Sequence, residues 1–587
     1  MKLLWNRFAL ILAGCFLLAA SGCALFRQPE SQIATLDLSH SIQTLTAAAP
    51  TAAETPTPSA IPVPETAEGQ NEAAVILIPL RTDDPNAEPT LIPTSTPKPA
   101  AENKDGSDQT TAVQEALADG GVYNRNGRRP THPVFRLESI PTPRTEDITY
   151  TVVSGDSVAA IANVYQVPVS AIQDRNNLAN PELIQIGQTL IIPAVEPEAL
   201  SIGSAIVPDR EIVDGPSTFN PETFLSDYPE NLLTNYIEPT PTPYPTAEPG
   251  DPVLPAPVFN ARGGLEILNE VALENAVNPR ILIALLEYQS QTITNDPPRR
   301  FLIENYIGAL GWRTSLDHQL SWAANTLNFG YYQWKNNRIN QWILADDSVV
   351  AVDPSVNAGT AALQYLFSKL YGREDWINAI GPDGFRATFE SLFGTFSDAE
   401  LSLNDPPESE PESALPFRAE DEWFFSSGPH YGWASGSPWS AIDFVPGDAI
   451  GCSASSYPVT AAADGLVVYS DAGLVVVDLD MDGDARTGWT HLYLHVGSKD
   501  RVALNARVRQ GDPIGYASCE GGFSSGTHLH FARRYNGQWI QIDGANPLVL
   551  SGFEAFSTGT VYDGYLVNGD QVVEAWYYQN DANRIDR

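Results

Sequence analysis

Histidine is scarce in this chain of 587 residues, and five of its eight histidines fall between positions 430 and 530. Two of them, His528 and His530, flank a single leucine. If this run is a β-strand, both imidazoles point to the same face, because side chains alternate along a strand. Two imidazoles on one face suit a metal site, or a metal ligand beside an acid/base group, provided that a carboxylate completes the set. Asp443, which lies between apolar residues at a strand-like spacing, is the candidate carboxylate.

The elements that must position these side chains are short strands. Residues 428–547 are rich in glycine and β-branched residues, and glycine separates short apolar runs such as 465–469, 473–479 and 491–496. Strand-like runs at such short intervals predict an antiparallel sheet. We therefore expect a mainly antiparallel β domain over 425–550. The last part of the chain, 551–587, predicts a short β extension to which we assign no chemistry.

The stretch 428–547 resembles the lysostaphin-like family of zinc endopeptidases that cut peptidoglycan peptides. The resemblance rests on segments taken together: the Gly-rich lead into His528-Leu529-His530-Phe531, Tyr493-Leu494-His495, Ala463-Asp464-Gly465 within 459–468, and Gly511-Asp512-Pro513-Ile514-Gly515. Many members place the first zinc histidine four residues before the aspartate, where this chain has Trp439. Gly428-Pro429-His430, with twelve residues between His430 and Asp443, instead resembles the beta-lytic (staphylolysin-like) branch.

This resemblance implies that His430, Asp443 and His530 bind one zinc ion per chain, with water in the open fourth position. Zinc with two neutral imidazoles and one carboxylate keeps a positive charge, which polarises the scissile carbonyl and lowers the pKa of its water to about 7. His495 and His528 correspond to the two non-ligand histidines of the family. One would take the proton of the water and the other would stabilise the oxyanion or protonate the leaving amine, and their division of roles stays open. If His430 is not a ligand, only two ligands remain and the site is expected to be inactive.

Two further features of this domain have simpler alternatives. His491 precedes His495 by four residues and matches no family position, so we expect a packed or exposed histidine there. An acidic run begins like a calcium loop, although its twelfth position is Trp489 instead of glutamate, and a solvated acidic turn is the alternative. The candidate calcium ligands are Asp478, Asp480, Asp482 and Asp484.

Residues 148–195 predict a strand, two short helices and a second strand. Together with Asn176-Asn177-Leu178 and Ile186-Gly187-Gln188-Thr189-Leu190, this order resembles the lysin motif (LysM). The resemblance implies binding to glycans that contain N-acetylglucosamine, including peptidoglycan, between the first strand–helix loop and the loop before the last strand. Each residue that it points to could instead keep a turn or fill the core. These residues are Gly155, Asp156, Ser157, Leu183 and Ile186.

Residues 259–400 predict a helical domain, with apolar residues at three- and four-residue spacing over 264–276 and 278–288. The second run loosely resembles the helix of lysozyme-like transglycosylases that carries the catalytic acid. Here Gln289 holds the place of the acid, and an amide cannot protonate a glycosidic oxygen. The nearest acid, Glu287, would point about 200° away on a helix. We therefore expect an all-α, lysozyme-like but non-catalytic domain, either glycan-contacting or purely structural.

The N-terminus resembles an export signal. Lys2 and Arg7 precede thirteen uncharged residues, which match a signal peptide and are too few for a comfortable membrane span. Ala20-Ser21-Gly22-Cys23 resembles the bacterial lipobox, which implies a diacylated Cys23 that holds the protein on the outer face of a membrane; ordinary secretion is the alternative. Cys15 also fits, but cleavage there would leave a stub of apolar sequence.

Of the four cysteines, Cys452 and Cys519 could form a disulfide in an oxidising compartment.

Composition sets the domain boundaries and excludes one class of partner. The 47 prolines gather in Pro/Thr/Ala/Glu-rich stretches that cannot bury enough apolar surface to fold. A formal charge of −39 would repel phosphate backbones, so we expect no nucleic-acid binding. The predicted segments are a signal peptide (1–22), a stalk (23–146), LysM (147–195), a linker (196–258), the helical domain (259–400), a linker (401–424), the peptidase (425–550) and the extension (551–587).

The sequence thus predicts a multidomain α+β lipoprotein of the cell envelope. We expect LysM to bind wall glycan and a zinc site to hydrolyse amide bonds of peptidoglycan stem peptides or cross-bridges. The main alternative is a non-catalytic wall-binding scaffold, or an activator of another hydrolase, whose peptidase domain has lost its metal. A glycan lyase centred on Glu287 is a third alternative.

Overall fold

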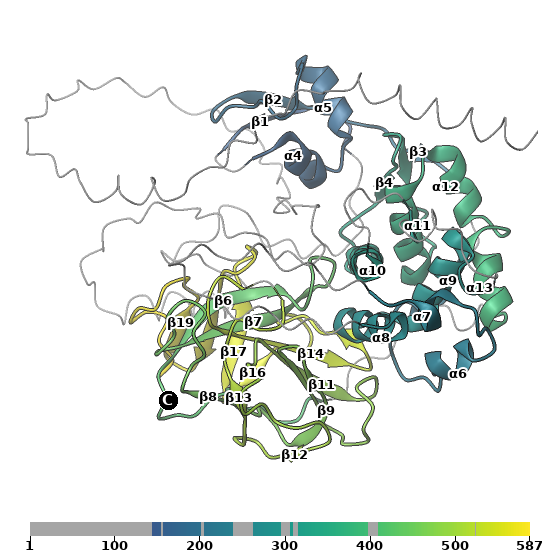
Figure 1. Cartoon of the computed structure of the whole chain (residues 1–587). Helices are drawn as coiled ribbons and strands as arrows, with labels where there is room; N and C mark the ends of the chain where they lie inside the picture. Colours follow the sequence, from purple (N-terminus) through teal and green to yellow (C-terminus); the bar gives the residue numbers. More distant parts are fainter. Residues whose placement is uncertain are drawn as a thin grey trace, which may run out of the picture. The chain divides into compact units, whose positions relative to one another are not determined.

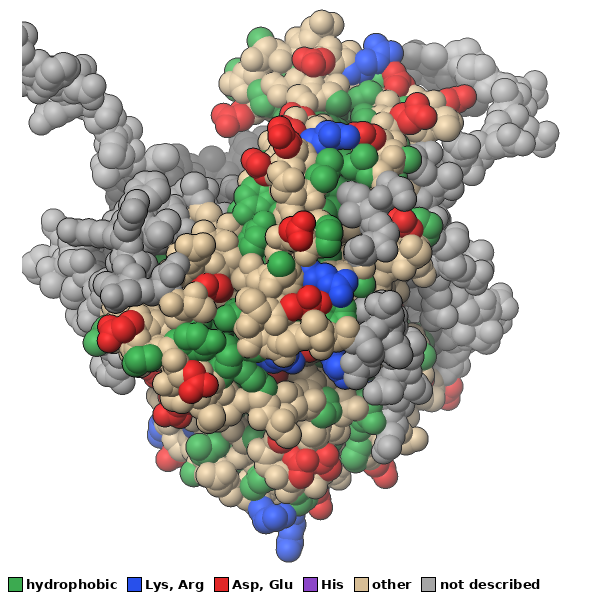
Figure 2. All heavy atoms as spheres, turned by 90° about the vertical axis from the view of Figure 1, so that its right-hand side faces the viewer, with side chains coloured by type: hydrophobic (Ala, Val, Ile, Leu, Met, Phe, Trp, Pro, Cys, Tyr) green, Lys and Arg blue, Asp and Glu red, His purple; other side chains and the backbone are tan. Residues whose placement is uncertain are grey.

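The computed structural model describes residues 144–153, 156–200, 205–238, 262–294, 306–308, 315–396, 409–522 and 524–586. The predicted signal peptide, almost all of the predicted stalk, Cys15, Cys23 and Gly155 lie outside these residues. Within the described ranges, no helix is both long enough and apolar enough to cross a membrane. On the face drawn in Figure 2, acidic side chains are scattered among polar and apolar ones, as expected for a chain of such negative charge.

The first domain has the predicted strand–helix–helix–strand order (Figure 1). Its elements are β1 (Ile148–Thr151), α4 (Val158–Tyr165), α5 (Val169–Asn176) and β2 (Thr189–Ile192). The two strands pair antiparallel, with Ile148 opposite Ile192. Alternation along β2 sends Leu190 and Ile192 into a small core against Val158 and Ile172, where all four are fully buried. The core is small because the domain offers only two short amphipathic helices.

The second domain is mostly helical but not all-α, which corrects the sequence prediction. Its helices are η1 (Asp209–Glu211), α6 (Pro221–Leu225), α7 (Leu232–Asn235), α8 (Gly264–Asn275), α9 (Pro279–Ser290), α10 (Leu316–Lys335), α11 (Ala358–Leu370), α12 (Arg373–Ile380) and α13 (Phe385–Phe393). A small sheet accompanies them, made of β3 (Glu198–Ala199), β5 (Val349–Ala351) and β4 (Gln341–Ile343) in that order. These strands are too short to give a period-two signal, and one of them is contributed by the segment before the domain.

This domain also begins earlier than predicted. The region 205–238 was expected to be part of a linker, but Ile206, Val207, Ile212 and Leu233 are buried in the helical core. Their spacing follows no helical or strand period, so the sequence pattern did not predict that these residues are buried. Tertiary burial orders this segment without long regular structure of its own.

The third domain is built from antiparallel strands, as predicted. Its elements are β6 (Trp423–Tyr431), β7 (Trp439–Pro446), β8 (Pro458–Thr460), β9 (Gly465–Asp471), β10 (Leu474–Asp478), β11 (Trp489–Leu494), β12 (Arg507–Val508), β13 (Pro513–Tyr516), β14 (Leu529–Tyr535), β15 (Gln538–Trp539), β16 (Val549–Leu550), β17 (Phe553–Ser557), β18 (Gly564–Asn568) and β19 (Gln571–Glu574). The main sheet runs β12-β9-β10-β11-β14-β7-β6, with β15 beside β14. The extension after 551 joins β16 in a four-stranded sheet, and its Ala555 and Leu566 are buried in the core of this domain.

The main sheet buries both of its faces. On one face, Tyr493 and Phe531 pack into the core of the β domain itself. On the other face, Leu492, Leu494 and Ala532 belong to the same apolar cluster as the helical domain. Figure 1 shows α8 near β14, and Arg534 on β14 donates hydrogen bonds to the carbonyls of Leu273 and Glu274 on α8. The helical domain therefore completes the core of the sheet, because strand alternation presents apolar side chains on both sides.

Part of the second predicted linker is also ordered. Within 409–422, Leu415 and Phe417 are buried, and the partly buried Glu410 contacts two buried polar side chains. The carboxylate of Glu410 accepts a hydrogen bond from Nε2 of His491 at 2.9 Å and pairs with the guanidinium of Arg533. The linker prediction for 401–424 was wrong here, because one carboxylate buried against two distant partners carries no compositional signal.

Glu410 makes the stability of the folded protein depend on pH in the acid range. Burial alone would raise the pKa of Glu410, but the hydrogen bond from His491 and the charge of Arg533 outweigh burial and hold the pKa below its ordinary value. A lowered carboxylate pKa stabilises the fold above the pKa of the unfolded chain, and this contribution is lost as the pH falls through the folded pKa.

We expect Glu410→Gln to lower the free energy of unfolding by about 3 kcal/mol at pH 7, because it leaves Arg533 buried without a counter-charge. The difference from the wild type should shrink as the pH falls through the lowered pKa of Glu410 in the folded protein, where Glu410 itself becomes neutral. Denaturant unfolding at several pH values measures both effects. The neighbouring Glu412→Gln, an exposed position, is the matched control and should change little. A variant as stable as the wild type at pH 7 would contradict this reading.

Candidate metal centre

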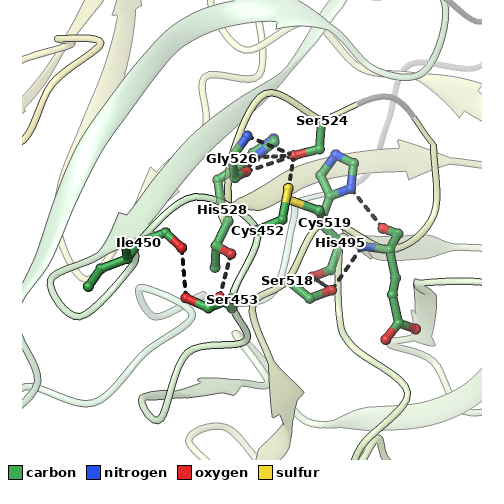
Figure 3. Close-up of a disulfide and its surroundings, with 11 residues drawn as sticks. Ile450, Cys452, Ser453, His495, Ser518, Cys519, Ser524, Gly526 and His528 are labelled. Atoms are coloured by element: carbon green, nitrogen blue, oxygen red, sulfur yellow. Dashed lines mark hydrogen bonds between the residues drawn. A yellow bond between two sulfur atoms is a disulfide. The ribbon is translucent and has the colours of Figure 1, made fainter. Parts of the chain in front are cut away.

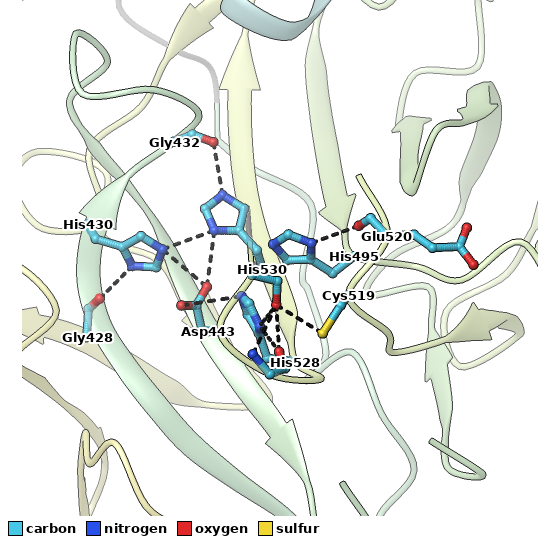
Figure 4. A network of polar contacts seen from close by, with 11 residues as sticks. Gly428, His430, Gly432, Asp443, His495, Cys519, Glu520, His528 and His530 are labelled. Atoms are coloured by element: carbon cyan, nitrogen blue, oxygen red, sulfur yellow. Dashed lines mark hydrogen bonds and ion pairs between the residues drawn. The ribbon is translucent and has the colours of Figure 1, made fainter. Parts of the chain in front are cut away.

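Three strands bring together the residues that the sequence proposed as metal ligands. His430 lies on β6, Asp443 on β7 and His530 on β14, and the register pairs His530 directly with Asp443. The facing atoms are Nε2 of His430, Oδ1 of Asp443 and Nδ1 of His530, at separations of 3.0, 3.1 and 3.2 Å from one another (Figure 4). Ligand atoms around a tetrahedral zinc with bonds of about 2.0–2.2 Å lie about 3.3 Å apart. The cluster therefore has the donor set and spacing of a metal site.

Backbone carbonyls fix which nitrogen of each candidate ligand ring carries the proton. Nδ1 of His430 lies 2.9 Å from the carbonyl of Gly428, and Nε2 of His530 lies 3.0 Å from that of Gly432. A carbonyl can only accept, so each of these nitrogens carries the ring proton. The opposite nitrogens then face one another and Asp443 as lone pairs in a buried place. Such a set is stabilised by a bound cation, and the two carbonyls are the outer-shell partners that metal-binding histidines require.

The surroundings keep Asp443 ionised. Burial alone would raise the pKa of Asp443, but the neighbouring His430, His528 and His530 outweigh burial and hold the pKa well below its ordinary value. An ionised carboxylate is the form that binds a metal.

The two other histidines of the prediction lie beside this cluster. Nδ1 of His495 donates to the carbonyl of Glu520 at 2.8 Å, and Nδ1 of His528 donates to that of Gly526 at 2.7 Å. Their rings pack together with centroids 4.3 Å apart, and Nε2 of His528 lies 4.0 Å from Oδ2 of Asp443. Nε2 of His495 is buried and has no hydrogen-bond partner among the described residues. Both rings thus keep Nε2 available.

His495 is held neutral and in an unusual backbone conformation. Burial lowers the pKa of His495 well below its ordinary value, and the nearby His528 lowers it further. The residue directly follows β11 and has a backbone φ of +66°, a left-handed conformation that residues other than glycine rarely adopt. Its carbonyl accepts hydrogen bonds from the backbone and the hydroxyl of Ser518, at 2.7 and 3.0 Å. Such local strain persists where the surrounding structure holds it, typically at functional sites.

The predicted disulfide is confirmed between Cys452 and Cys519 (Figure 3). It joins the loop after β7 to the loop that leads into His528. Thr527 adds two hydrogen bonds between the same loops, to the carbonyls of Gly451 at 2.7 Å and Ser453 at 2.6 Å. The disulfide and these bonds together position the backbone next to His528.

Tyr562 completes the surroundings of His430, and sequence reasoning missed it. Its ring packs on the imidazole of His430, with centroids 4.7 Å apart and an interplanar angle of 31°. Its carbonyl accepts a hydrogen bond from the backbone of Gly428 at 2.8 Å. A side chain on Gly428 would collide with the backbone of Asp563, so only glycine permits this approach. The extension that was assigned no chemistry therefore packs against the metal centre, through a contact that no local pattern encodes.

Other predicted site residues have structural roles. His491 is fully buried against Glu410, so of the two expected cases, packed or exposed, the structure has the packed one. In the acidic run, the carboxylates of Asp478, Asp480 and Asp482 approach one another, whereas Asp484 pairs with the guanidinium of its neighbour Arg486. Asp478 and Asp480 accept backbone N–H groups of their own turn, which is typical of an acidic turn. The calcium prediction gains no support.

The lysin-motif residues divide into two kinds. Asp156 accepts hydrogen bonds from the backbone of Val153 at 2.7 Å and the hydroxyl of Tyr150 at 2.8 Å, and the Ser157 hydroxyl caps α4. These two residues hold the turn. Leu183 and Ile186 are each 73% exposed, which leaves their apolar side chains available to a ligand.

The carboxylate of Glu287 is engaged in the turn after α9. Its carboxylate accepts hydrogen bonds from the backbone of Ile293 at 3.0 Å and of Thr294 at 3.1 Å, and from the hydroxyl of Thr294 at 2.5 Å. Gln289 accepts a hydrogen bond from Tyr371. Because both oxygens of Glu287 close the turn after α9, the lyase alternative is disfavoured.

Three family models match separate parts of the chain. Residues 150–193 match the LysM domain, residues 205–406 match the N-terminal domain of LasA, and residues 445–542 match peptidase family M23. The helical domain thus matches a family other than the lysozyme-like one that the sequence suggested. The M23 match contains His495, His528 and His530 but begins just after Asp443.

Known proteins resemble the same regions. Protease LasA of Pseudomonas aeruginosa is 30% identical over 293 residues, which cover 46% of this chain and 66% of that protein. The chain therefore spans just under two thirds of the length of this relative. Beta-lytic metalloendopeptidase of Lysobacter enzymogenes is 25% identical over 178 residues, 28% of this chain and 94% of that protein. The solved structure of the M23 metalloprotease pseudoalterin, described as from deep sea, is 23% identical; the match covers 30% of this chain and all of that one, with a TM-score of 0.25.

We expect replacement of both Cys452 and Cys519 by serine to lower the free energy of unfolding by about 2–4 kcal/mol, because the bond closes a loop across 67 positions. Thermal unfolding with and without a reducing agent measures this effect. Reductant should lower the melting temperature of the wild type and leave that of the double variant unchanged. Equal stability of the two oxidised proteins would contradict a stabilising role.

Proposed function

We propose that this chain, an M23-family zinc peptidase with a LysM domain, is an exported cell-envelope hydrolase that cleaves amide bonds in the stem peptides or cross-bridges of peptidoglycan. The observation that carries the proposal is the meeting of three potential metal-binding atoms, Nε2 of His430, Oδ1 of Asp443 and Nδ1 of His530, within 3.2 Å of one another.

The donors present fit one zinc ion. Two neutral imidazoles and one carboxylate form the usual protein set of a catalytic zinc, which leaves a position for water or substrate. When bound, zinc supplies Lewis-acid chemistry: it polarises a carbonyl and lowers the pKa of a coordinated water. The Asp443 carboxylate balances part of the charge of the ion, and the carbonyls of Gly428 and Gly432 keep both imidazoles in the binding tautomer.

His495 and His528 would move the protons of amide hydrolysis. His495 is neutral at pH 7 because burial lowers its pKa, and its Nε2 lone pair is placed to accept the proton of an attacking water. A proton on Nε2 of His528 would face the Asp443 carboxylate, which suits this residue to stabilise the oxyanion or protonate the leaving amine. The disulfide keeps the loop of His528 in place for this step.

The LysM domain would bring the peptidase to its substrate. We propose that it binds glycan containing N-acetylglucosamine next to the loop with Asp156 and Ser157, with Leu183 and Ile186 as exposed apolar contacts; Gly155 belongs to the same proposal by its position in the sequence. Binding of glycan by one domain raises the effective concentration of attached peptides for the other.

We propose that the chain is exported, and that Cys23 anchors it to a membrane through a lipid. The Cys452–Cys519 disulfide supports export, since such bonds persist in oxidising compartments. A lipid anchor would keep the hydrolase at the cell surface or in the periplasm.

Digestion of purified peptidoglycan tests the function. The wild type should contain about one zinc per chain and release free amino groups, and a chelator should abolish the release. His530→Ala should lose both zinc and activity, whereas His495→Ala should keep zinc and lose about 10²–10⁴-fold in rate, as expected for loss of a general base. His318→Ala, a histidine of the helical domain, is the control and should keep both.

Other outcomes separate the alternatives. A protein that binds peptidoglycan but contains no zinc and releases no amine would be a scaffold or an activator of another hydrolase. Anhydro-sugar ends without new amines would indicate a glycan lyase. Either result would overturn the peptidase proposal.

A further inference from the structure

The carbonyl of Gly432 orients a candidate metal ligand, and the ring of Trp539 packs closely against the same glycine. This carbonyl accepts the Nε2 proton of His530 at 3.0 Å and thereby sets which nitrogen of this imidazole faces the metal. The residue is the first of the loop 432–438 between β6 and β7. A Cβ built on Gly432 would lie 2.2 Å from Oγ of Ser440 and 2.5 Å from Cε3 of Trp539, so the Ser440 hydroxyl and the indole ring both approach this glycine closely.

Trp539 is itself fixed by the helical domain. Its indole Nε1 donates to the carbonyl of Asn275, the last residue of α8, at 3.1 Å. Its backbone N–H donates to the hydroxyl of Tyr332 on α10 at 2.9 Å. The guanidinium of Arg534 stacks over the indole at 3.8 Å and donates to the carbonyls of Leu273 and Glu274. Trp539 is only 3% exposed, so these contacts lie in the protein interior.

The rest of the loop 432–438 is attached to the same helix α10. The side-chain carbonyl of Asn325 accepts the backbone N–H of Gly436 at 2.6 Å, and its amide contacts the hydroxyl of Ser435 at 3.3 Å. Beside Trp539, Lys335 donates to Gln538 at 2.6 Å. The helical domain therefore holds both the loop that carries the Gly432 carbonyl and the ring that packs on it.

We propose that Trp539 is a positioning residue of the metal centre, which transmits the docking of α8 and α10 to His530 through the carbonyl of Gly432. The proposal rests on the zinc site of the proposed function. It assigns the helical domain a part in metal affinity, because loss of an outer-shell partner of a metal-binding histidine costs about 10–100-fold in affinity.

The dissociation constant of zinc, measured on the full-length protein by competition with a chelator dye, tests this role. Trp539→Ala should raise the dissociation constant about 10-fold or more. Trp489→Ala is the matched control, since Trp489 is equally buried in the same sheet but packs on Tyr535 and Arg533. It should destabilise the fold comparably and leave zinc affinity unchanged.

A second pair of variants, each lacking only one hydroxyl group, tests the proposal if Trp539→Ala fails to fold. Tyr332→Phe removes only the hydroxyl that holds the backbone of Trp539, and it should weaken zinc binding several-fold. Tyr331→Phe, the adjacent buried tyrosine whose hydroxyl meets Lys335, should not. Cobalt absorption spectra of Tyr332→Phe should also shift from those of the wild type, because the ring of His530 is less firmly oriented.

The outcomes separate the two proposals. If the wild type binds no zinc, the proposed function itself fails. If the wild type binds zinc and Trp539→Ala and Tyr332→Phe bind it within twofold of the wild type, only the positioning role fails. An equal loss of affinity in Trp489→Ala would likewise overturn it, since general destabilisation would then explain the effect.

Discussion

The structure depends on one electrostatic constraint: three atoms that each present a lone pair must be held within about 3 Å of one another, away from water. Such atoms repel one another unless a cation joins them. The fold meets this constraint with rigid parts. Adjacent strands place His530 opposite Asp443, and two backbone carbonyls take up the protons of His430 and His530. Each carbonyl is fixed in turn by a distant part of the chain.

These distant parts explain why the β domain is larger than the region that matches peptidase family M23. The extension after 551 supplies Tyr562, which packs on His430, and the helical domain supports the loop of Gly432. Because the apolar face with Leu492, Leu494 and Ala532 is covered by the helical domain, the two domains share one core. In our proposal, the stability of this domain interface and the order of the candidate metal centre are therefore linked.

The residues with chemistry could be found in the sequence because their spacing is local. His528 directly precedes β14 and His530 lies on it two positions later, and the lysin motif is closed by short-range turns and caps. The domain boundaries were harder to predict from the sequence. Composition predicted linkers over 196–258 and 401–424, yet Ile206, Leu415 and Glu410 are held in cores by partners far away in the chain. A single buried side chain gives no periodic pattern in the sequence from which its burial could be predicted.

The sequence by itself determined the chemistry available: which imidazoles and carboxylate can share a strand face, which cysteines can pair, and the order of the domains. Only the tertiary structure decided how these groups are arranged: the tautomer of each ring, the neutral state of His495, the packing of Tyr562 and the support from α8 and α10. The physical reason is that residue type and strand period act over a few positions, whereas burial and hydrogen bonding join atoms a hundred or more residues apart.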